Sequence, residues 1–197
     1  MYPEESLEII NWGIRVYNQY LIDNEKYGRL EFEIYNNIGP LIKQRGYLLR
    51  DEFLTIGEWF NAMHIHQYQK NDENRIILIT KESFQSKNEE IKLHSLVLLA
   101  GIGYSAATCI LSVVYPNKYL IFDPRVWQML CHWNYLDSSI TRLNHPNDWI
   151  KYLNAVSRIS HKYNLPTLDI FRALISIDRK FRLRKEIKIS RSLSEFF

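Results

Sequence analysis

Hydrophobic residues recur at steps of three and four along most of the chain, the spacing that places them on one face of an α-helix. In the first stretch, for which Pro3 is the expected start, these positions are Leu7, Ile10, Ile14, Tyr17 and Leu21. The sequence has neither a repeat of fixed length nor a low-complexity tract. The chain is therefore predicted to be all-α, as a single domain over residues 1–197 that can divide into two helical lobes.

In the first half, residues that stop or start helices set the predicted boundaries. Gly39-Pro40 is expected to break one helix, and Asp51 is expected to cap the next. Residues 71–74 are polar and are predicted to form a loop. The apolar run 76–79 fits a short strand or a helical turn, and the helical turn agrees better with an all-α chain.

Two helices near the middle of the chain give the clearest pattern. One is predicted over residues 91–99 and stops at Gly101, and the next restarts just after Gly103. The glycines permit positive φ angles and let another chain approach the backbone closely. Ile102, between them, is expected to point inward and anchor the turn. The two helices together form a predicted hairpin over residues 91–114.

The chain after this hairpin is also predicted to be helical. An extended link over 119–122 leads to Asp123-Pro124, which is expected to start a helix, because Asp is a favoured N-cap and Pro a favoured first residue. Two further helices are predicted over about 146–163 and 166–181, each opened by a proline.

Composition and charge narrow the class of protein. A hydrophobic share of 46% is enough to build a core, which argues against a disordered chain. A net charge of +3 permits a nucleic-acid partner without requiring one. The charge is uneven, since seven basic residues and only Glu186 as an acid lie between Arg179 and Arg191. This segment either contacts phosphate or is a solvated tail.

Several other classes are excluded by patterns that the sequence lacks. It has no apolar run long enough to span a bilayer and no secretory signal, so a cytoplasmic location without a membrane partner is expected. Cys109 and Cys131 are expected to be buried free thiols, too few for an iron–sulfur cluster. His64 and His66 have no further ligands at a metal-binding spacing, so no metal site is expected.

The predicted hairpin also carries candidate chemistry. The first N–H groups of the helix after Gly103 have no partner within the helix and carry the positive end of its dipole, which favours a bound phosphate. Ser105, in the first turn of that helix, can donate to the same phosphate. Taken alone, Gly101-Ile102-Gly103 is equally typical of an ordinary helical hairpin with a glycine cap.

A second feature, Asp123, lies twenty residues after Gly103. Together, the segments 98–111 (LLAGIGYSAATCIL) and 119–127 (YLIFDPRVW) resemble the helix-hairpin-helix (HhH-GPD) superfamily of base-excision DNA glycosylases, most closely its 8-oxoguanine glycosylase-like branch. In that superfamily a Leu-x-Gly-(Ile/Val)-Gly hairpin is followed, about twenty residues on, by a catalytic Asp. The match covers residues 98–130, about a sixth of the chain.

The resemblance implies a two-lobed helical glycosylase-like fold, double-stranded DNA as the partner, and base-excision repair as the activity. It assigns phosphate contact to Gly101, Ile102 and Gly103, and catalysis to Asp123. It allows a monovalent cation held by hairpin carbonyls, and no other cofactor is expected. The chain departs from the pattern at Ser105, where bifunctional members carry a Schiff-base lysine. This departure implies a monofunctional enzyme, or one that has lost activity.

A glycosylase of this kind needs a carboxylate and a pocket for a flipped base. A carboxylate stabilises the oxocarbenium-like transition state, and extruded bases stack on aromatic rings. Trp127 follows Asp123 at i+4 and is expected on its face, while Tyr104, Trp59, Phe60 and Trp133 are further base-pocket candidates. Packing in the core is the alternative for each ring. Arg125 can pair with a phosphate or with a carboxylate. Because it lies only two residues from Asp123, it is expected off that face and is assigned to a phosphate.

Three functional hypotheses follow. The first is a monofunctional glycosylase that hydrolyses a damaged or modified base from DNA. The second is a non-catalytic helix-hairpin-helix module that only binds DNA, and the third is a helical interaction protein whose hairpin is accidental. The enzyme hypothesis requires the turn at 101–103 and the Asp123 carboxylate to face the same groove.

Overall fold

The computed structural model describes residues 2–138 and 140–194, and it describes side chains only as far as residue 182. Every regular element in these ranges is helical and none is a strand, which confirms the all-α prediction. The elements are α1 (Leu7–Asp23), α2 (Glu25–Glu33), a π-helical turn η1 (Ile34–Ile38), α3 (Gly39–Arg45), α4 (Arg50–Asn61), a 3₁₀ turn η2 (Ala62–His64), α5 (Ile65–Tyr68), α6 (Glu73–Gln85), α7 (Glu89–Val97), α8 (Tyr104–Val114), α9 (Pro124–His132), α10 (Pro146–Tyr163) and α11 (Thr167–Ser194).

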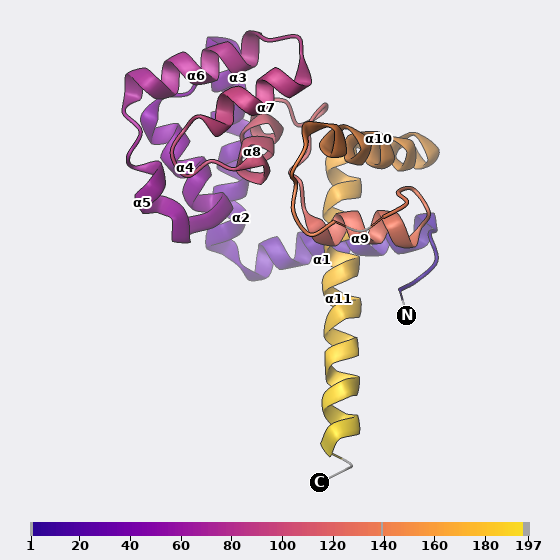
Figure 1. Ribbon diagram of the computed structural model, residues 1–197. Coiled ribbons are helices and arrows are strands. Elements are labelled where there is room, and N and C mark those ends of the chain that lie inside the picture. Colours follow the sequence, from indigo (N-terminus) through magenta and orange to yellow (C-terminus); the bar gives the residue numbers. More distant parts are fainter. Residues whose placement is uncertain (1, 139, 195–197) are drawn as a thin grey trace.

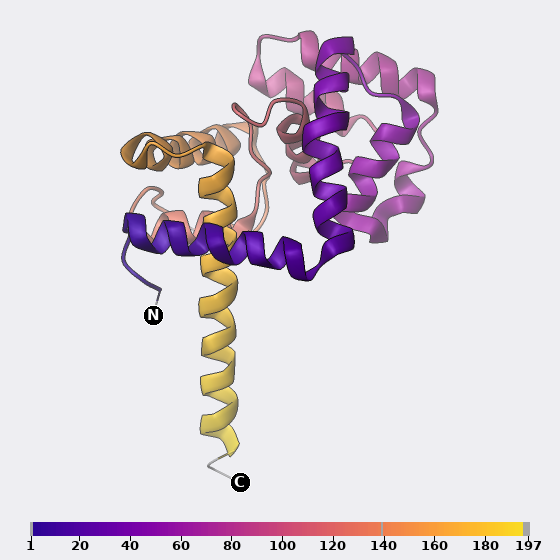
Figure 2. The same cartoon turned by 180° about the vertical axis from the view of Figure 1, so that it is seen from behind.

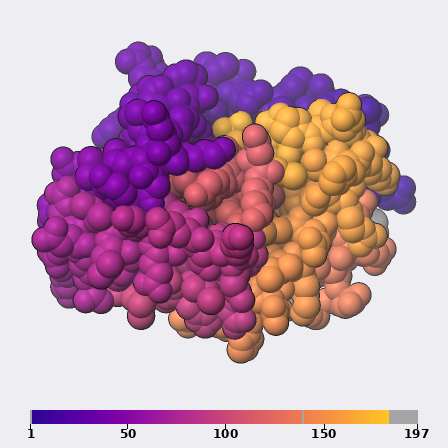
Figure 3. All heavy atoms as spheres, turned by 90° about the horizontal axis from the view of Figure 1, so that it is seen from above, coloured from indigo at the N-terminus to yellow at the C-terminus, as the bar shows by residue number. Residues whose placement is uncertain are grey.

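The helices pack in two groups (Figures 1 and 2). Helices α2 to α8 form the first group, and α1, α9, α10 and α11 form the second. Helix α1 crosses α11 in the second group, and its far end leads into α2 in the first. In a view from above, the magenta atoms of the first group and the orange and yellow atoms of the second meet along a seam, with salmon atoms from the middle of the chain between them (Figure 3).

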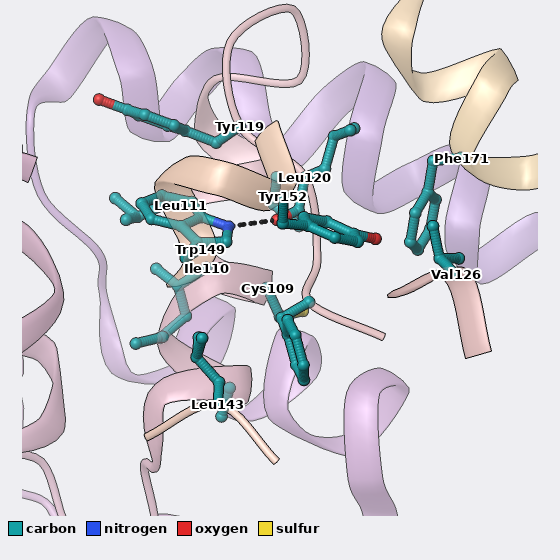
Figure 4. Packing of buried hydrophobic residues seen from close by; sticks show 14 of the residues in the cluster. Cys109, Ile110, Leu111, Tyr119, Leu120, Val126, Leu143, Trp149, Tyr152 and Phe171 are labelled. Carbon is teal, nitrogen blue, oxygen red and sulfur yellow. Dashed lines mark hydrogen bonds between the residues drawn. The ribbon is translucent and has the colours of Figure 1, made fainter. Parts of the chain in front are cut away.

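A single hydrophobic core connects the two groups and fixes the extended link before α9. Side chains of α8, α9 and α10 meet in this core (Figure 4). The Trp149 indole donates to the Leu120 carbonyl at 2.9 Å, and the Tyr152 hydroxyl donates to the Ile121 carbonyl at 3.0 Å. The Phe122 N–H donates to the Thr108 hydroxyl at 2.9 Å. These bonds satisfy a buried stretch of backbone, and they hold the residue that follows it, Asp123, in a defined place.

The crossing of α1 and α11 depends on a glycine. A Cβ atom at Gly13 would lie 2.8 Å from the Ala173 carbonyl oxygen and 2.9 Å from the Ala173 Cα. Both residues are buried. Only a residue without a side chain lets the two backbones approach this closely, so Gly13 sets the distance between the helices.

Helix boundaries agree with the sequence predictions where the residues next to the helix start mark it. Helix α9 begins at Pro124 after the N-cap Asp123, and α10 spans Pro146–Tyr163 as expected. The run 76–79 lies within α6 and is helical. Helix α11 begins close to the expected residue but continues well past 181, to Ser194.

Three other boundaries were predicted wrongly. Pro3 does not open α1, because Ser6 is the N-cap and accepts the Ile9 N–H at 3.2 Å. Asp51 is not a cap either, since α4 begins one residue before it and the Glu52 carboxylate accepts the Leu49 N–H at 2.9 Å. In each case a polar side chain near the helix start, and not the residue nearest the apolar pattern, accepts one of the free N–H groups.

Gly39-Pro40 does not break the helical path. The chain passes from α2 into the π-helical turn η1 and continues directly as α3, with Pro40 in the first turn of α3. Proline lacks the N–H that an α-helical ladder needs at its position, and the change to a π turn just before it lets the helix continue. The predicted loop 71–74 is also shorter, because α6 begins at Glu73 with Asp72 as its N-cap.

Candidate functional site

The predicted hairpin is present as α7, a six-residue turn and α8, with α7 ending at Val97, two residues earlier than expected. Gly101 has a φ of 82°, and a Cβ atom there would lie 2.7 Å from Gln67 Cβ. Gly103 is the N-cap of α8 and is exposed, with no atom within 4 Å of its would-be Cβ. Ile102 is buried, as predicted. Gly101 thus shapes the turn, and Gly103 leaves the start of α8 open to a ligand.

A buried asparagine holds the turn, and the sequence interpretation missed it. The Ala100 N–H donates to Asn71 Oδ1 at 2.8 Å, and Asn71 Nδ2 donates back to the Ala100 carbonyl at 3.0 Å. Arg75 donates to the Leu98 carbonyl at 2.7 Å. Two turn carbonyls are therefore already engaged, and the monovalent cation that the resemblance allows does not find free carbonyls at these positions.

A cavity of about 430 Å³ lies beside the turn. Tyr104, Ser105 and Arg142 line it together with the turn glycines and Phe60. The Tyr104 ring also meets the His94 ring edge-on at 5.7 Å between centroids. Ser105 and Tyr104 therefore lie at the hairpin, as their positions in the first turn of α8 require. Arg142 comes from the loop before α10, and no pattern in the sequence pointed to it.

Asp123 is paired with Arg125 through both carboxylate oxygens. Its Oδ1 accepts the Arg125 backbone N–H at 2.8 Å and Nε at 3.0 Å, and its Oδ2 accepts Nη2 at 2.5 Å. The hydrogen bonds that Arg125 donates to Asp123 raise the pKa of Arg125. The expectation that Arg125 turns away from Asp123 is thus wrong, because an N-cap lies outside the helix and its side chain folds back over the first turn.

Asp123 lies at a second cavity, of about 210 Å³, which has several aromatic rings in its walls. Tyr27 stacks on Trp59 with centroids 6.2 Å apart, and Tyr35 meets Trp59 edge-on at 5.8 Å. Other walls come from α1, α4, the link before α9 and α11, as Tyr17, Phe60, Ile121, Leu168, Phe171 and Ile175. The cavity therefore lies where the two groups of helices meet.

A buried ion pair forms the polar part of this cavity. Glu31 is 2% exposed, and it accepts a hydrogen bond from the Tyr17 hydroxyl at 2.7 Å and one from Arg172 Nη2 at 2.7 Å. Burial lowers the pKa of Arg172, but Glu31 more than compensates and the pKa is raised. Burial and Glu31 also raise the pKa of Tyr17 strongly. The cavity thus combines flat apolar walls with a charged edge of both signs.

Sequence reasoning missed most of these residues, although one signal was available. Tyr27, Glu31 and Tyr35 follow one another at steps of four, so they lie on one face of a helix. An acid between two aromatic residues on such a face indicates a buried carboxylate that needs a partner. The partner, Arg172, lies far away in sequence and gave no comparable signal.

The predicted base-pocket residues lie in different parts of the structure. Trp59 lines the Asp123 cavity, whereas Tyr104 lies at the hairpin. Trp127 lies at neither, because it is 3% exposed, stacks on Tyr152 with an angle of 1° between the rings, and donates to the Ser138 carbonyl at 2.5 Å. Trp127 is a core residue, and the assumption that an i+4 spacing places it beside the N-cap carboxylate was wrong.

The hairpin and Asp123 do not line one cavity. They line two neighbouring cavities, and Phe60 on α4 is a wall of both. The structure thus has two cavities that share Phe60 where the sequence predicted one common groove.

Other predicted features concern cysteines, metals and membranes. Both cysteines are free, but only Cys109 is fully buried; Cys131 is half-buried and its Sγ donates to the Ser138 carbonyl. Within residues 2–138 and 140–194, no group of three His, Cys, Asp or Glu residues is arranged to hold a metal ion. No helix in the same ranges is long and apolar enough to cross a membrane. Of the basic segment 179–191, side chains beyond 182 lie outside the described residues.

Comparison of this chain with protein-family models, curated proteins and solved structures finds no match.

Proposed function

We propose that this chain is a monofunctional DNA glycosylase that hydrolyses the N-glycosidic bond of a damaged or modified base in double-stranded DNA. One observation carries the proposal: Asp123, the N-cap of α9, lines a cavity of about 210 Å³ that has several aromatic rings in its walls. The hairpin lines a neighbouring cavity that shares Phe60 as a wall, so the proposal needs one DNA strand to reach both cavities in place of the single groove that the sequence predicts.

The size and lining of this cavity suit a single base. Pockets for drug-sized ligands usually measure about 300–1,000 Å³, so a smaller cavity favours a smaller, flat ligand. A flipped base gains its binding energy from stacking on aromatic faces and from hydrogen bonds to its edge. Trp59, Tyr27 and Tyr35 provide such faces, and Glu31 with Arg172 provides an edge that can accept and donate.

The chemistry follows from the charge that develops during cleavage. As the glycosidic bond breaks, the sugar gains oxocarbenium character, and a nearby carboxylate stabilises that charge. The same carboxylate can orient or deprotonate the attacking water. The Asp123 cavity has arginines but no lysine among its described residues, and Ser105 stands at the start of α8. Hydrolysis by water is therefore expected instead of attack by an amine.

The hairpin supplies a phosphate contact in this proposal. The N–H groups in the first turn of α8 face outward beyond Gly103, where no side chain blocks the approach of a DNA backbone. The two groups of helices then act as two lobes that hold the strand across the seam, in line with the glycosylase-like fold that the resemblance implies.

A non-catalytic DNA-binding module is the second candidate, and the Asp123–Arg125 pair favours it. Both carboxylate oxygens are engaged by Arg125. A carboxylate in this state stabilises a developing positive charge less well, because the guanidinium already neutralises it. The enzyme hypothesis therefore requires Arg125 to release at least one oxygen when DNA binds.

The proposal is tested with duplexes that carry uracil, 8-oxoguanine, an alkylated base or only normal bases. Each duplex is incubated with the protein and then analysed with and without hot alkali. Strand breaks that appear only after alkali are the expected result, because a monofunctional glycosylase leaves an intact backbone. Breaks without alkali contradict the monofunctional assignment, since they require a lyase nucleophile. Binding without breaks on every duplex contradicts the enzyme and supports the module.

A further inference from the structure

A third cavity, of about 470 Å³, lies between α1 and α11 beside the Asp123 cavity. We call it the α1–α11 groove. The two hollows share Tyr17, Tyr27, Arg125 and Ile175 as walls, so they are neighbours separated by side chains and not by backbone. Helix α11, which lines the groove with Ile175, Ser176, Arg179 and Lys180, extends beyond the rest of the molecule (Figure 1).

The groove is rich in cations. Arg125, Arg179 and Lys180 line it, and Asp23 is the acid in its lining. Asp23 already accepts a hydrogen bond from Gln19 at 2.8 Å, and Arg125 is neutralised by Asp123. No carboxylate among the described side chains forms an ion pair with Arg179 or Lys180, and both residues are exposed. The groove therefore has positive charge available for an anionic ligand.

The same groove is also lined with tyrosine rings. Tyr17, Tyr20 and Tyr27 contribute to its wall, and the Arg179 guanidinium lies 4.8 Å from the centre of the Tyr20 ring. A bare phosphate site needs no rings, and an apolar ligand needs no cations. A ligand that uses both features is flat on one side and negatively charged on the other, which is the chemistry of a nucleotide.

We propose that the α1–α11 groove binds a nucleotide of the same strand, next to the base that faces Asp123. Its base lies against Tyr20 and Tyr27, and its phosphate is held by Arg179 and Lys180. The identification of the strand as DNA rests on the proposed function. The groove would then hold the single-stranded path of a distorted duplex at the point where one nucleotide leaves the stack.

A binding experiment tests this site without any catalysis. The probe is a fluorescently labelled, single-stranded oligothymidine of about ten nucleotides, followed by anisotropy with the full chain. The double substitution Arg179→Gln with Lys180→Gln should weaken binding about tenfold or more at low salt. The matched control, Lys81→Gln with Lys87→Gln, removes the same charge from exposed positions in the first group of helices and should change affinity less than about twofold.

Competition then identifies the ligand. Thymidine 5′-monophosphate should displace the probe at lower concentration than thymidine or inorganic phosphate, and Tyr20→Leu should weaken the monophosphate more than phosphate. Equal displacement by inorganic phosphate overturns the nucleotide site. If the monophosphate binds as tightly as the oligonucleotide, the site belongs to a free nucleotide and the strand is excluded. An unchanged double variant, or no probe binding at all, also overturns the inference.

The outcomes separate this site from the proposed function. Loss of probe binding in the groove variant, with no base released from any duplex, supports the nucleotide site in the groove and contradicts the glycosylase. Base release from a duplex, together with unchanged probe binding in the groove variant, supports the glycosylase and overturns the groove site. A thermal melt of each variant, expected to match that of the parent because both cations are exposed, excludes unfolding as the cause.

Discussion

At the scale of single residues, the two glycines of the hairpin have different tasks. Gly101 has a positive φ and contacts the Tyr68 side chain so closely that a Cβ atom would lie 3.0 Å from its ring. Gly103 has an ordinary φ of −94° and open space around it. Both are glycines in one short motif, yet only the first is required by the fold of this chain. For the second, the proposed phosphate contact supplies a reason, because a ligand there would approach the backbone.

Alanine substitutions should separate these tasks. Gly101→Ala should lower the free energy of unfolding by about 1–3 kcal/mol, because the methyl group meets backbone strain and a packed ring. Gly103→Ala should change it by less than about 0.5 kcal/mol but weaken DNA binding, since the new methyl group covers the start of α8. Urea unfolding and duplex binding of both variants measure this. Equal effects of the two substitutions on stability, or full DNA affinity in Gly103→Ala, would contradict the assignment.

Arg125 shows why a helical-wheel argument fails at a helix end. Residues inside a helix project at fixed angles, so a spacing of two places side chains on different faces. Asp123 lies just outside α9 as its N-cap, and its carboxylate turns back toward the first turn. Arg125 can therefore reach both oxygens. The sequence predicted the cap correctly, but the same cap made its prediction for Arg125 wrong.

At the scale of helices, close packing between distant segments decides the positions of the site residues. The contact of Gly13 with Ala173 brings α1 against α11, and α1 then carries Tyr17 to the Asp123 cavity. Local signals such as Asp123 before α9 were sufficient to predict where helices begin. The crossing of α1 with α11 could not be predicted, because a small residue in a helix is compatible with many partners.

A methyl group at this crossing should push the two helices apart. Gly13→Ala should lower the free energy of unfolding by about 1–3 kcal/mol, because overpacking outweighs the higher helix propensity of alanine. The control is Asn18→Ala, an exposed position on the same helix, which should change stability by less than about 0.5 kcal/mol. Urea unfolding measures both. A stabilised Gly13→Ala variant would show that α1 and α11 are not in this contact.

At the scale of the whole molecule, the Asp123 cavity is a product of the fold and not of any one motif. Its walls come from α1, α2, η1, α4, α9 and α11, and its ion pair joins Glu31 on α2 to Arg172 on α11. The sequence motif supplied Asp123 and the hairpin, which lie within about thirty residues of each other. The other residues that line the cavity are scattered over the chain, so their assembly could be found only from the packing of the two groups.

Buried tyrosines in this packing predict how stability depends on pH. Burial raises the pKa of Tyr119 and Tyr152 above the value of 10.0 for an unburied tyrosine. Above that pH the unfolded chain loses these protons while the folded chain keeps them. The free energy of unfolding is therefore unaffected by these groups below pH 10 and falls above it, by up to about 1.4 kcal/mol per pH unit for each tyrosine.

Urea unfolding at a series of pH values from about 9 to about 11.5 checks this slope. Tyr119→Phe keeps the ring in the core and removes one of the ionising groups, together with its hydrogen bond to Glu89. Its stability should be lower at neutral pH but should fall less steeply above pH 10 than that of the parent. Parallel curves for the two proteins would show that the Tyr119 proton is not retained in the folded state.

The central claim is that the carboxylate of Asp123 promotes base release, and one comparison tests it most directly. Single-turnover base release is measured for the parent and for Asp123→Asn on the panel of damaged duplexes, with duplex affinity measured in parallel. Asparagine is as good an N-cap as aspartate, so α9 should keep its start. The account predicts unchanged affinity and a rate at least about a hundredfold lower in the variant. Base release at the parent rate by Asp123→Asn, or none by the parent on any duplex, would contradict it.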